Sequence, residues 1–225
     1  GVDFIPDIMV GRFTNETDFT LQVMVNKFKL YEKTPYVTNS DWFKKGVCCS
    51  NNAYASQIST KRFAYSRMME GGFTSVDTLM SDGDPWTGQE CTVDLDNVTS
   101  AINNGRSFLN YRGEGWDSGW SASCYSFQVQ DVTGLNNGQM MPFVTSIGCG
   151  VAMFDTWNGN CFGEEWIEMG SIANPKGAAC FIGPTSNTHT AYNNSIDRGI
   201  YVGMFREEMD TPGQAMLHPP PPPPP

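Results

Sequence analysis

Basic residues and long apolar runs are scarce in this sequence. Lysine and arginine together number 14 against 24 acidic residues, so the formal net charge is -10 at pH 7. Nucleic-acid binding requires a clustered basic face, and this composition excludes a nucleic-acid partner. The sequence also lacks a run of about 18 apolar residues that would span a bilayer. We therefore expect an acidic protein that is secreted or lies on a cell surface, and Gly1 in place of Met predicts a processed chain.

Recognisable metal and redox signatures are lacking as well. None of the seven cysteines shows the Cys-x-x-Cys spacing of metal or redox sites, and their odd number means that at least one is unpaired. We expect most of them to be buried small apolar residues, and their disulfide pairing stays open. Histidine is limited to His189 and His218, which restricts any imidazole chemistry to two positions.

The length and composition fit a single globular unit. The 225 residues are 40% hydrophobic, which is ample for the core of one large α/β domain over residues 1–217. Two subdomains, about 1–45 and 46–217, are an alternative division. Residues 218–225 consist of His218 and seven prolines, a polyproline II tether or linker, or else a disordered tail without a role.

Strand and helix signals alternate along the chain. A strand is predicted at 5–13, and the following helix presents one apolar face before Pro35 ends it. That face comprises Leu21, Met24, Val25, Phe28 and Tyr31. Further strands are predicted at 46–49, 73–80, 107–111, 142–149 and 177–182, and further helices at 56–70, 94–102 and 161–169. This alternation predicts a mainly parallel sheet between helix layers.

Three loops at the carboxyl edge of this sheet are the expected place for a functional site. They follow Tyr111, Ile147 and Ile182. Ligands and catalytic groups in open α/β sheets collect outside the carboxyl ends of the strands. Each of these loops carries a distinctive segment.

These segments resemble the gingipain family of cysteine peptidases. Residues 107–115 (SFLNYRGEG) are similar to the family's strand ending in Asn-Tyr-x-Gly-His-Gly, and 142–149 (PFVTSIGC) resemble the strand that delivers the nucleophilic cysteine. Residues 161–164 (CFGE), 177–185 (GAACFIGPT) and 8–13 (IMVGRF) also resemble family segments, in the same order. The resemblance covers most of residues 5–190. It implies a caspase-like three-layer α/β/α sandwich and a bacterial protein that acts on polypeptides.

The resemblance places Cys149 at the nucleophile position. Its small neighbours Gly148 and Gly150 would let a substrate backbone approach and present amides to an oxyanion, and Gly113 and Gly115 flank the same site. The alternative for Cys149 is a buried core thiol without a chemical role. Trp116, in the loop that follows, would wall a substrate subsite or serve only for packing.

Glu114 stands where the family has its catalytic histidine. A carboxylate beside a thiol raises the thiol pKa, whereas an imidazolium lowers it, so a plain Cys-His dyad is broken. His189, just after the third strand, would replace the base from another loop, with Glu114 orienting it. The alternative is a loop histidine that only hydrogen-bonds its neighbours.

One metal site is suggested by the sequence. Asp82 and Asp84 offer hard oxygen ligands of the kind that calcium takes, and the resemblance implies a structural calcium but no cofactor for the reaction. The full EF-hand spacing is lacking, and a solvated turn is the alternative.

Three functions are compatible with these observations. The first is a secreted or cell-surface cysteine endopeptidase domain that uses Cys149, supported by Glu114 or His189. The second is a catalytically inactive pseudopeptidase that serves as a binding or assembly module for a protein partner. The third is a subunit of an extracellular filament or surface layer, suggested by the polyproline end and the acidic surface. Whether the chain is an enzyme depends on which group replaces the missing histidine.

Overall fold

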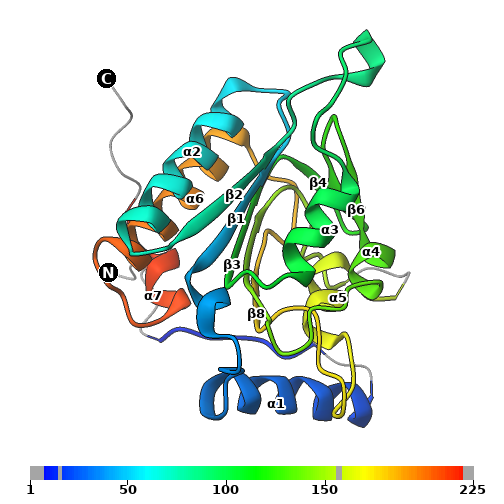
Figure 1. The fold of residues 1–225 in the computed structure, drawn as a ribbon, viewed down its shortest axis with the longest axis vertical. Coiled ribbons are helices and arrows are strands. Elements are labelled where there is room, and N and C mark those ends of the chain that lie inside the picture. The colour runs from blue at the N-terminus through cyan, green and yellow to red at the C-terminus, as the bar shows by residue number, and fades with distance from the viewer. Residues whose placement is uncertain (1–7, 15–16, 156–158, 220–225) are drawn as a thin grey trace, which may run out of the picture.

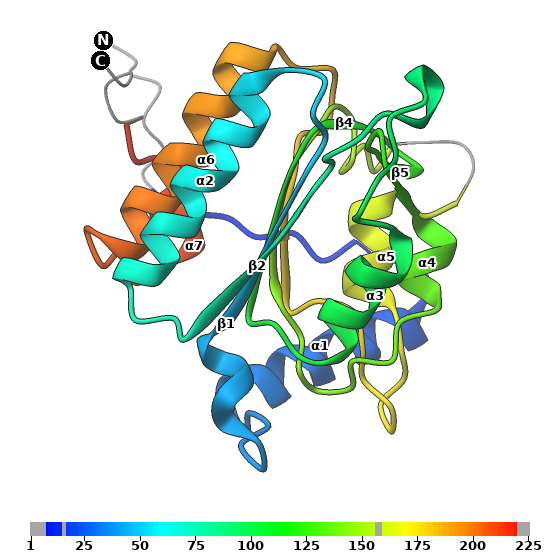
Figure 2. The same ribbon diagram turned by 45° about the horizontal axis from the view of Figure 1, so that its top comes forward.

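A five-stranded parallel sheet organises the molecule. The structure is a computed structural model that describes residues 8–14, 17–155 and 159–219. The strands follow the order β2-β1-β3-β7-β8, and every neighbouring pair is parallel. Helices α2, α6 and α7 cover one face of this sheet, and α3, α4 and α5 cover the other (Figures 1 and 2). The predicted three-layer α/β/α architecture is thereby confirmed.

The elements have the following bounds. The strands of the main sheet are β1 (Lys45–Ser50), β2 (Ser75–Met80), β3 (Phe108–Arg112), β7 (Phe143–Ile147) and β8 (Cys180–Ile182). A small antiparallel sheet contains β4 (Glu114–Trp116), β5 (Gly119–Ser121) and β6 (Ser126–Gln128). The α-helices are α1 (Asp18–Lys33), α2 (Ala55–Glu70), α3 (Leu95–Asn103), α4 (Val129–Thr133), α5 (Phe162–Glu168), α6 (Thr190–Phe205) and α7 (Pro212–Met216). Two 3-10 helices are η1 (Ser40–Lys44) and η2 (Pro85–Thr87).

Local signals explain why the central elements begin and end where they do. Asp94 caps α3 through a reciprocal pair of hydrogen bonds with Asn97, which satisfies two backbone N–H groups at the helix start. Gly72 and Gly105, which follow α2 and α3, both adopt positive φ, a conformation that favours glycine. The predicted strands 46–49, 73–80, 107–111 and 142–149 and the predicted helices 56–70, 94–102 and 161–169 are confirmed within a few residues. The strand predicted at 177–182 is shorter, Cys180–Ile182.

The N-terminal prediction is wrong in two respects. The described residues 8–13 of the expected strand form no strand, and Ile8 and Val10 are largely exposed. The predicted helix exists and begins at Asp18 after the capping residue Thr17. Of the expected inward face, only Met24 is fully buried, and Phe28 is half exposed.

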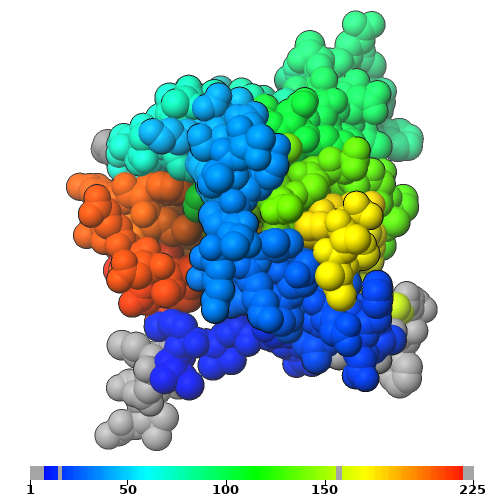
Figure 3. All heavy atoms as spheres, turned by 60° about the horizontal axis from the view of Figure 1, so that its bottom comes forward, coloured from blue at the N-terminus to red at the C-terminus, as the bar shows by residue number. Residues whose placement is uncertain are grey.

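The face of α1 that packs inward is centred on a lysine. Lys27 is buried, and its ammonium donates hydrogen bonds to the carbonyls of Trp166 (3.0 Å), Ile167 (2.7 Å) and Met169 (3.3 Å). These carbonyls lie at the C-terminal end of α5, where helices carry unsatisfied acceptors. Helix α1 lies along the lower face of the molecule, beside the segment around residues 170–177 (Figure 3). Apolar periodicity predicted this helix but not its inward face, because that face is anchored by a buried cation.

Several elements carried no sequence signal. The strands of the small sheet have three residues each, in a segment rich in glycine and serine. Helix α6 begins immediately after His189, where the sequence suggested only a loop. No helix of the described residues is long and apolar enough to cross a membrane. Most of the predicted tail, residues 220–225, lies outside the described part of the chain, and the division into subdomains 1–45 and 46–217 stays a prediction.

The two sides of the sheet carry separate cores because side chains alternate along each strand. Within β1, Val47 and Cys49 pack on the α3/α5 side, whereas Cys48 packs on the α2/α6 side. Both cysteines are fully buried, and so is Cys161, but the other four are only partly buried, so the prediction that most of the seven cysteines are buried is wrong. Trp120 lies in the first core and stacks on Tyr111 at 4.3 Å between ring centroids.

A buried polar network joins the central strand to the two helices above it. Lys61 of α2 and Asp197 of α6 form an ion pair with no solvent exposure, and Asn110 of β3 hydrogen-bonds both of them. The amide of Asn110 also donates to the hydroxyl of Thr145 (2.7 Å), which in turn lies 3.0 Å from the hydroxyl of Tyr201. Every member of this network therefore has a partner inside the core.

Breaking this pair should destabilise the fold severely. Lys61→Met would leave Asp197 charged and unpaired in the core, and losses of this kind cost about 3 to 5 kcal/mol of unfolding free energy. The matched control is Glu70→Gln, because Glu70 pairs with Arg67 at the exposed end of α2, where such pairs contribute about 0 to 1 kcal/mol. Urea unfolding of the two variants measures the difference. Equal losses would show that the buried pair has no special weight.

Lys27 should make stability depend on pH. Burial lowers the pKa of Lys27 to about 7, although Glu165 and Glu168 oppose this shift. In the unfolded chain, Lys27 keeps its proton up to about pH 10.5. Between about pH 7 and pH 10.5 the unfolded chain therefore binds more protons than the folded chain, so the free energy of unfolding rises with pH. We expect Lys27 to contribute a rise of about 2 kcal/mol between about pH 7 and pH 9.

The measurement is urea unfolding at the two pH values for the natural chain and for Lys27→Met. The rise should be smaller in that variant by the stated amount, whereas the exposed neighbour Lys29 provides a control, Lys29→Met, that keeps it. An identical pH response in Lys27→Met and the natural chain contradicts the assignment.

Candidate active site

The thiol of Cys149 lies at the carboxyl edge of the sheet, two residues after β7 ends at Ile147. The side chain is partly buried, and its hydrogen bonds among the described residues are all with Thr188. The thiol donates toward the Thr188 carbonyl at 3.5 Å, accepts from the Thr188 backbone N–H at 3.5 Å and lies 3.8 Å from its hydroxyl. Sulfur at a strand end, in contact with the loop after β8, matches the position expected from the sequence.

Glycines bring the loop after β3 against the loop that carries Cys149. A Cβ on Gly148 would lie 3.0 Å from the carbonyl oxygen of Gly113 and 3.3 Å from the backbone nitrogen of Gly115. These separations are tight for a real side chain, so the absence of one allows the two backbones to touch. Gly150 has φ +65°, a left-handed conformation that glycine adopts without strain. The structure thus brings together the four glycines singled out from the sequence.

The Glu114 carboxylate is held by amides. Asn51 donates to one carboxylate oxygen, and Gln57 donates to the other at 3.3 Å. The backbone carbonyl of Glu114 accepts a 2.7 Å hydrogen bond from the Tyr111 hydroxyl. Asn51 is itself oriented by Ser123, whose N–H and hydroxyl both donate to its side-chain oxygen at 2.8 Å. No described contact joins the carboxylate to an imidazole, so the predicted orienting role toward His189 has no support in this arrangement.

A buried arginine lies beneath these loops. Arg112, the last residue of β3, is almost fully buried, and its guanidinium donates to the carbonyls of Gly113 (3.3 Å), Ile147 (3.2 Å) and Thr190 (3.2 Å) and to the Asn194 side chain (2.8 Å). Burial lowers the pKa of Arg112. The guanidinium satisfies strand-end carbonyls that the sheet leaves free, and it ties the loops after β3 and β7 to the start of α6.

His189 takes a structural position. It is the capping residue of α6, and its Nδ1 accepts the backbone N–H of Ala191 at 3.3 Å. The ring is exposed and lies edge-on to Tyr192 at 5.7 Å between centroids. No contact joins the imidazole to Cys149, although Thr188, the preceding residue, touches the sulfur.

The aromatic residues after Glu114 separate into two kinds. Trp120 and Tyr125 are buried and serve for packing in the core. Trp116 on β4 is 54% exposed and borders the site, since the backbone at residues 116–117 approaches Gly150. Its predicted role as a substrate wall stays a prediction.

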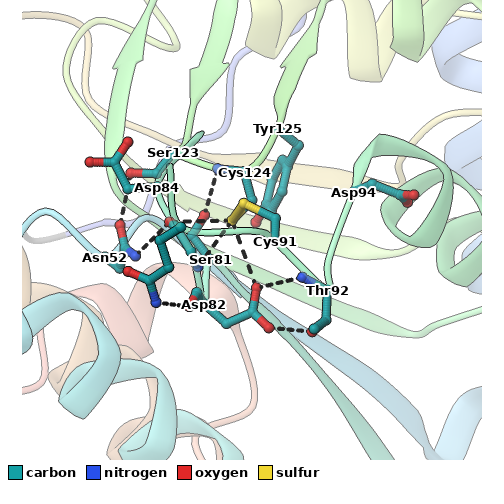
Figure 4. Close-up of a disulfide and its surroundings, with 12 residues drawn as sticks. Asn52, Ser81, Asp82, Asp84, Cys91, Thr92, Asp94, Ser123, Cys124 and Tyr125 are labelled. Atoms are coloured by element: carbon teal, nitrogen blue, oxygen red, sulfur yellow. Dashed lines mark hydrogen bonds between the residues drawn. A yellow bond between two sulfur atoms is a disulfide. The ribbon is translucent and has the colours of Figure 1, made fainter. Parts of the chain in front are cut away.

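A disulfide joins Cys91 to Cys124 in this region, with 5.6 Å between the Cα atoms. It links the segment before α3 to the turn between β5 and β6 (Figure 4). The sequence left this pairing open, because neither cysteine belongs to a recognisable motif. The other five cysteines are free.

The predicted calcium ligands do not form a cage. Both oxygens of Asp82 accept hydrogen bonds from Thr92, which lowers the pKa of Asp82. One oxygen of Asp84 accepts the backbone N–H of Trp86 at 3.0 Å. Within the described residues, the metal-sized group of ligand atoms here consists of Asp82 and the two disulfide sulfurs, and sulfur already bonded to sulfur is no calcium ligand. Among the described residues, no third carboxylate joins Asp82 and Asp84, and the calcium site stays a prediction.

Sequence reasoning missed the groups that hold the site residues in place. Four residues that contact the predicted site loops or side chains were not among the predicted site residues. They are Asn51, Gln57, Thr188 and Arg112. The position of Asn51 directly after β1 was the available signal, since it places this residue at the same carboxyl edge. Arg112 occupies the variable position of the Asn-Tyr-x-Gly segment, and this position gave no indication that the side chain is buried beneath the site.

The fold and the thiol-bearing loop define an α/β domain of the cysteine peptidase class. The chain belongs to Peptidase family C25, whose profile matches residues 1–219. It is similar to Gingipain R2 of Porphyromonas gingivalis strain ATCC BAA-308 / W83, with 24% identity over 194 residues, which cover 83% of this chain and 25% of the relative. Gingipain R1 of Porphyromonas gingivalis is 23% identical over 194 residues, 83% of this chain and 18% of the relative.

Solved structures agree on the fold. The crystal structure of the Arg-specific cysteine proteinase gingipain R matches with a TM-score of 0.78 at 20% identity, covering 97% of this chain and 54% of that chain. The complex of Porphyromonas gingivalis RgpB pro- and mature domains matches with a TM-score of 0.76 at 20% identity, covering 97% and 56%. The chain therefore spans about a quarter of the Gingipain R2 relative and about half of these structures.

Cys149 should be the first cysteine to react with iodoacetamide. Burial raises the pKa of Cys48 and Cys161 to about 12 and that of Cys180 to about 11, and it also raises the pKa of Cys49. These thiols are therefore protonated near neutral pH as well as shielded, and protonated thiols alkylate slowly. Peptide mass spectrometry after brief labelling gives the order, with the urea-unfolded chain as the control in which all five react. Simultaneous labelling of Cys180 would contradict the expectation.

Proposed function

We propose that this domain is a pseudopeptidase, an exported bacterial module that binds polypeptide segments at the Cys149 edge without imidazole-assisted hydrolysis. The observation that carries the proposal is the surroundings of the thiol. The chain has two histidines, and neither contacts Cys149: His189 caps α6, and His218 lies beyond α7. A cysteine peptidase needs a base or cation that keeps its thiol ionised.

Glu114 is central to the proposal. In the resemblance to the gingipain family, this residue occupies the position of the catalytic histidine. A carboxylate there cannot act as the imidazole that pairs with the thiol in a Cys-His dyad. Its two amide partners, Asn51 and Gln57, donate hydrogen bonds to the two carboxylate oxygens. The surrounding side chains are therefore complementary to a carboxylate at this position.

Polypeptide binding is supported by what the site retains. The loops after β3 and β7 keep the glycines that let a backbone approach closely, and membership of a peptidase family makes polypeptides the expected ligands. Exported localisation is supported by the Cys91–Cys124 disulfide, since such bonds persist in oxidising compartments. The bacterial origin of the similar gingipains points the same way.

An active endopeptidase is the second candidate, and one observation favours it. His189 directly follows Thr188, whose backbone touches the Cys149 sulfur. Catalytic hydrogen bonds are often loose in ligand-free sites and tighten when substrate binds. Rotation of the His189 side chain away from Ala191 would be required to place its imidazole beside the thiol.

Replacing Glu114 by histidine should create hydrolytic activity. General-base assistance typically contributes about 10²- to 10⁴-fold, so Glu114→His is expected to hydrolyse a mixed peptide library at least about 10²-fold faster than the natural chain. Glu114→Gln is the matched control, because it removes the charge, keeps a similar size and adds no base. Cys149→Ala supplies the blank.

His189→Ala decides between the two candidates. The proposal expects no change from this substitution, and a natural chain no more active than the blank. Activity of the natural chain that disappears in His189→Ala would overturn the proposal and establish the relocated base. Binding is read separately, because a peptide that occupies the site should slow alkylation of Cys149; if no library peptide protects the thiol, the binding role is wrong.

A further inference from the structure

A hydrogen-bonded projection stands at the carboxyl edge of the sheet. We call residues 82–92 the finger; it follows β2 and projects beyond the body of the domain, at the upper right of Figure 1. At its tip, η2 presents Trp86, whose side chain is 95% exposed, the highest exposure of any large apolar residue described. Because β2 is parallel to β7, the finger rises from the same sheet edge as Cys149.

The finger is ordered by its own hydrogen bonds. Asp84 and Gln89 exchange two backbone hydrogen bonds of 3.0 Å across its neck. The Asp84 carboxylate accepts the backbone N–H of Trp86, and the Thr87 hydroxyl donates to the Asp84 carbonyl at 2.9 Å. Gly88 closes the turn with φ +83°. The indole is therefore presented on a preformed turn.

The base of the finger is fixed to the domain (Figure 4). The Cys91–Cys124 disulfide anchors one side to the turn between β5 and β6. On the other side, the Asn52 amide donates to the Gly83 carbonyl at 3.0 Å. A large aromatic residue held out in this way has no packing role in the fold, whereas aromatic anchors on rigid supports are common at the centre of interfaces.

The charge around Trp86 defines the chemistry of the partner. Asp82, Asp84, Glu90 and Asp94 are the only charged residues between positions 81 and 94, and all are acidic. The indole face attracts cations through its quadrupole, and nearby carboxylates add direct attraction. An anionic membrane surface is disfavoured by the same charges and by the net charge of -10.

We propose that the finger is a docking element for a polypeptide segment that carries lysine or arginine, with a cationic side chain lying on the indole of Trp86 between the carboxylates of the finger. The proposal is independent of any chemistry at Cys149. Because both features share one sheet edge, a segment docked on the finger would extend along the edge that carries the thiol.

The test uses the full chain labelled with 5-fluorotryptophan and observed by fluorine NMR. Trp86→Phe assigns the Trp86 resonance among those of the six tryptophans. Octapeptides of alternating Gly-Arg, Gly-Lys and Gly-Glu serve as probes, at low and moderate salt. The cationic peptides are expected to shift the Trp86 resonance with saturation, whereas the Gly-Glu peptide leaves it unchanged.

Variants separate the finger from general attraction to an acidic protein. Affinity for the cationic peptides, measured by fluorescence anisotropy, is expected to fall at least about tenfold in Trp86→Ala. It should fall by a smaller factor in Glu90→Gln, whose carboxylate makes no hydrogen bond among the described residues. Phe19→Ala is the matched control, since it removes an exposed aromatic side chain from α1, which lies at the other end of the molecule (Figure 1), and it should bind like the natural chain.

Three results would overturn the proposal. Equal affinity of Trp86→Ala and the natural chain would mean diffuse electrostatic attraction only. Saturable shifts of the Trp86 resonance by phosphatidylcholine vesicles, with none from peptides, would make the finger a membrane contact. No shift from any probe would leave the finger without a binding role for this class of ligand.

Discussion

The fold depends on a pair of opposite charges that never meets water. Charged groups are costly to bury unless they are paired, so Lys61 and Asp197 can occupy the core only together, with Asn110 hydrogen-bonded to both. The pair fixes α2 and α6 over the central strand. Arg112 lies two residues further along that strand and reaches the start of α6. The position of Thr188 against Cys149 thus follows from an interaction in the interior.

The candidate site lies at the sheet edge of a gingipain-like fold, and its polar groups are satisfied among themselves. The Glu114 carboxylate is met by two amides, the Arg112 guanidinium by carbonyls, and the thiol by Thr188. Each contact lowers the free energy of the resting site. A catalytic site instead leaves a base and a nucleophile poised to exchange a proton, and this contrast is what the proposed role in recognition rests on.

The sequence predicted the central βα units because their strands are apolar and their helices end at glycine. It failed where tertiary contacts override periodicity: α1 buries Lys27 rather than Phe28, and an exposed apolar stripe is indistinguishable from a core face in one dimension. The loops around Gly113 and Cys149 were predictable, since parallel strands end at one edge. The direction of the His189 ring could not be predicted, because a helix-capping histidine and a catalytic histidine can occupy the same position in a loop.

The Cys91–Cys124 bridge has a topological consequence. The covalent loop that it closes spans 33 residues in sequence separation and contains α3, the central strand β3 and Glu114. A single cut by a foreign protease inside that loop leaves both fragments joined through sulfur, whereas a cut at the tip of the finger, outside the loop, separates them. If proteases cut the domain, β3 therefore stays covalently attached to the rest of the chain. A cut at the tip of the finger, in contrast, leaves no covalent link between the two fragments.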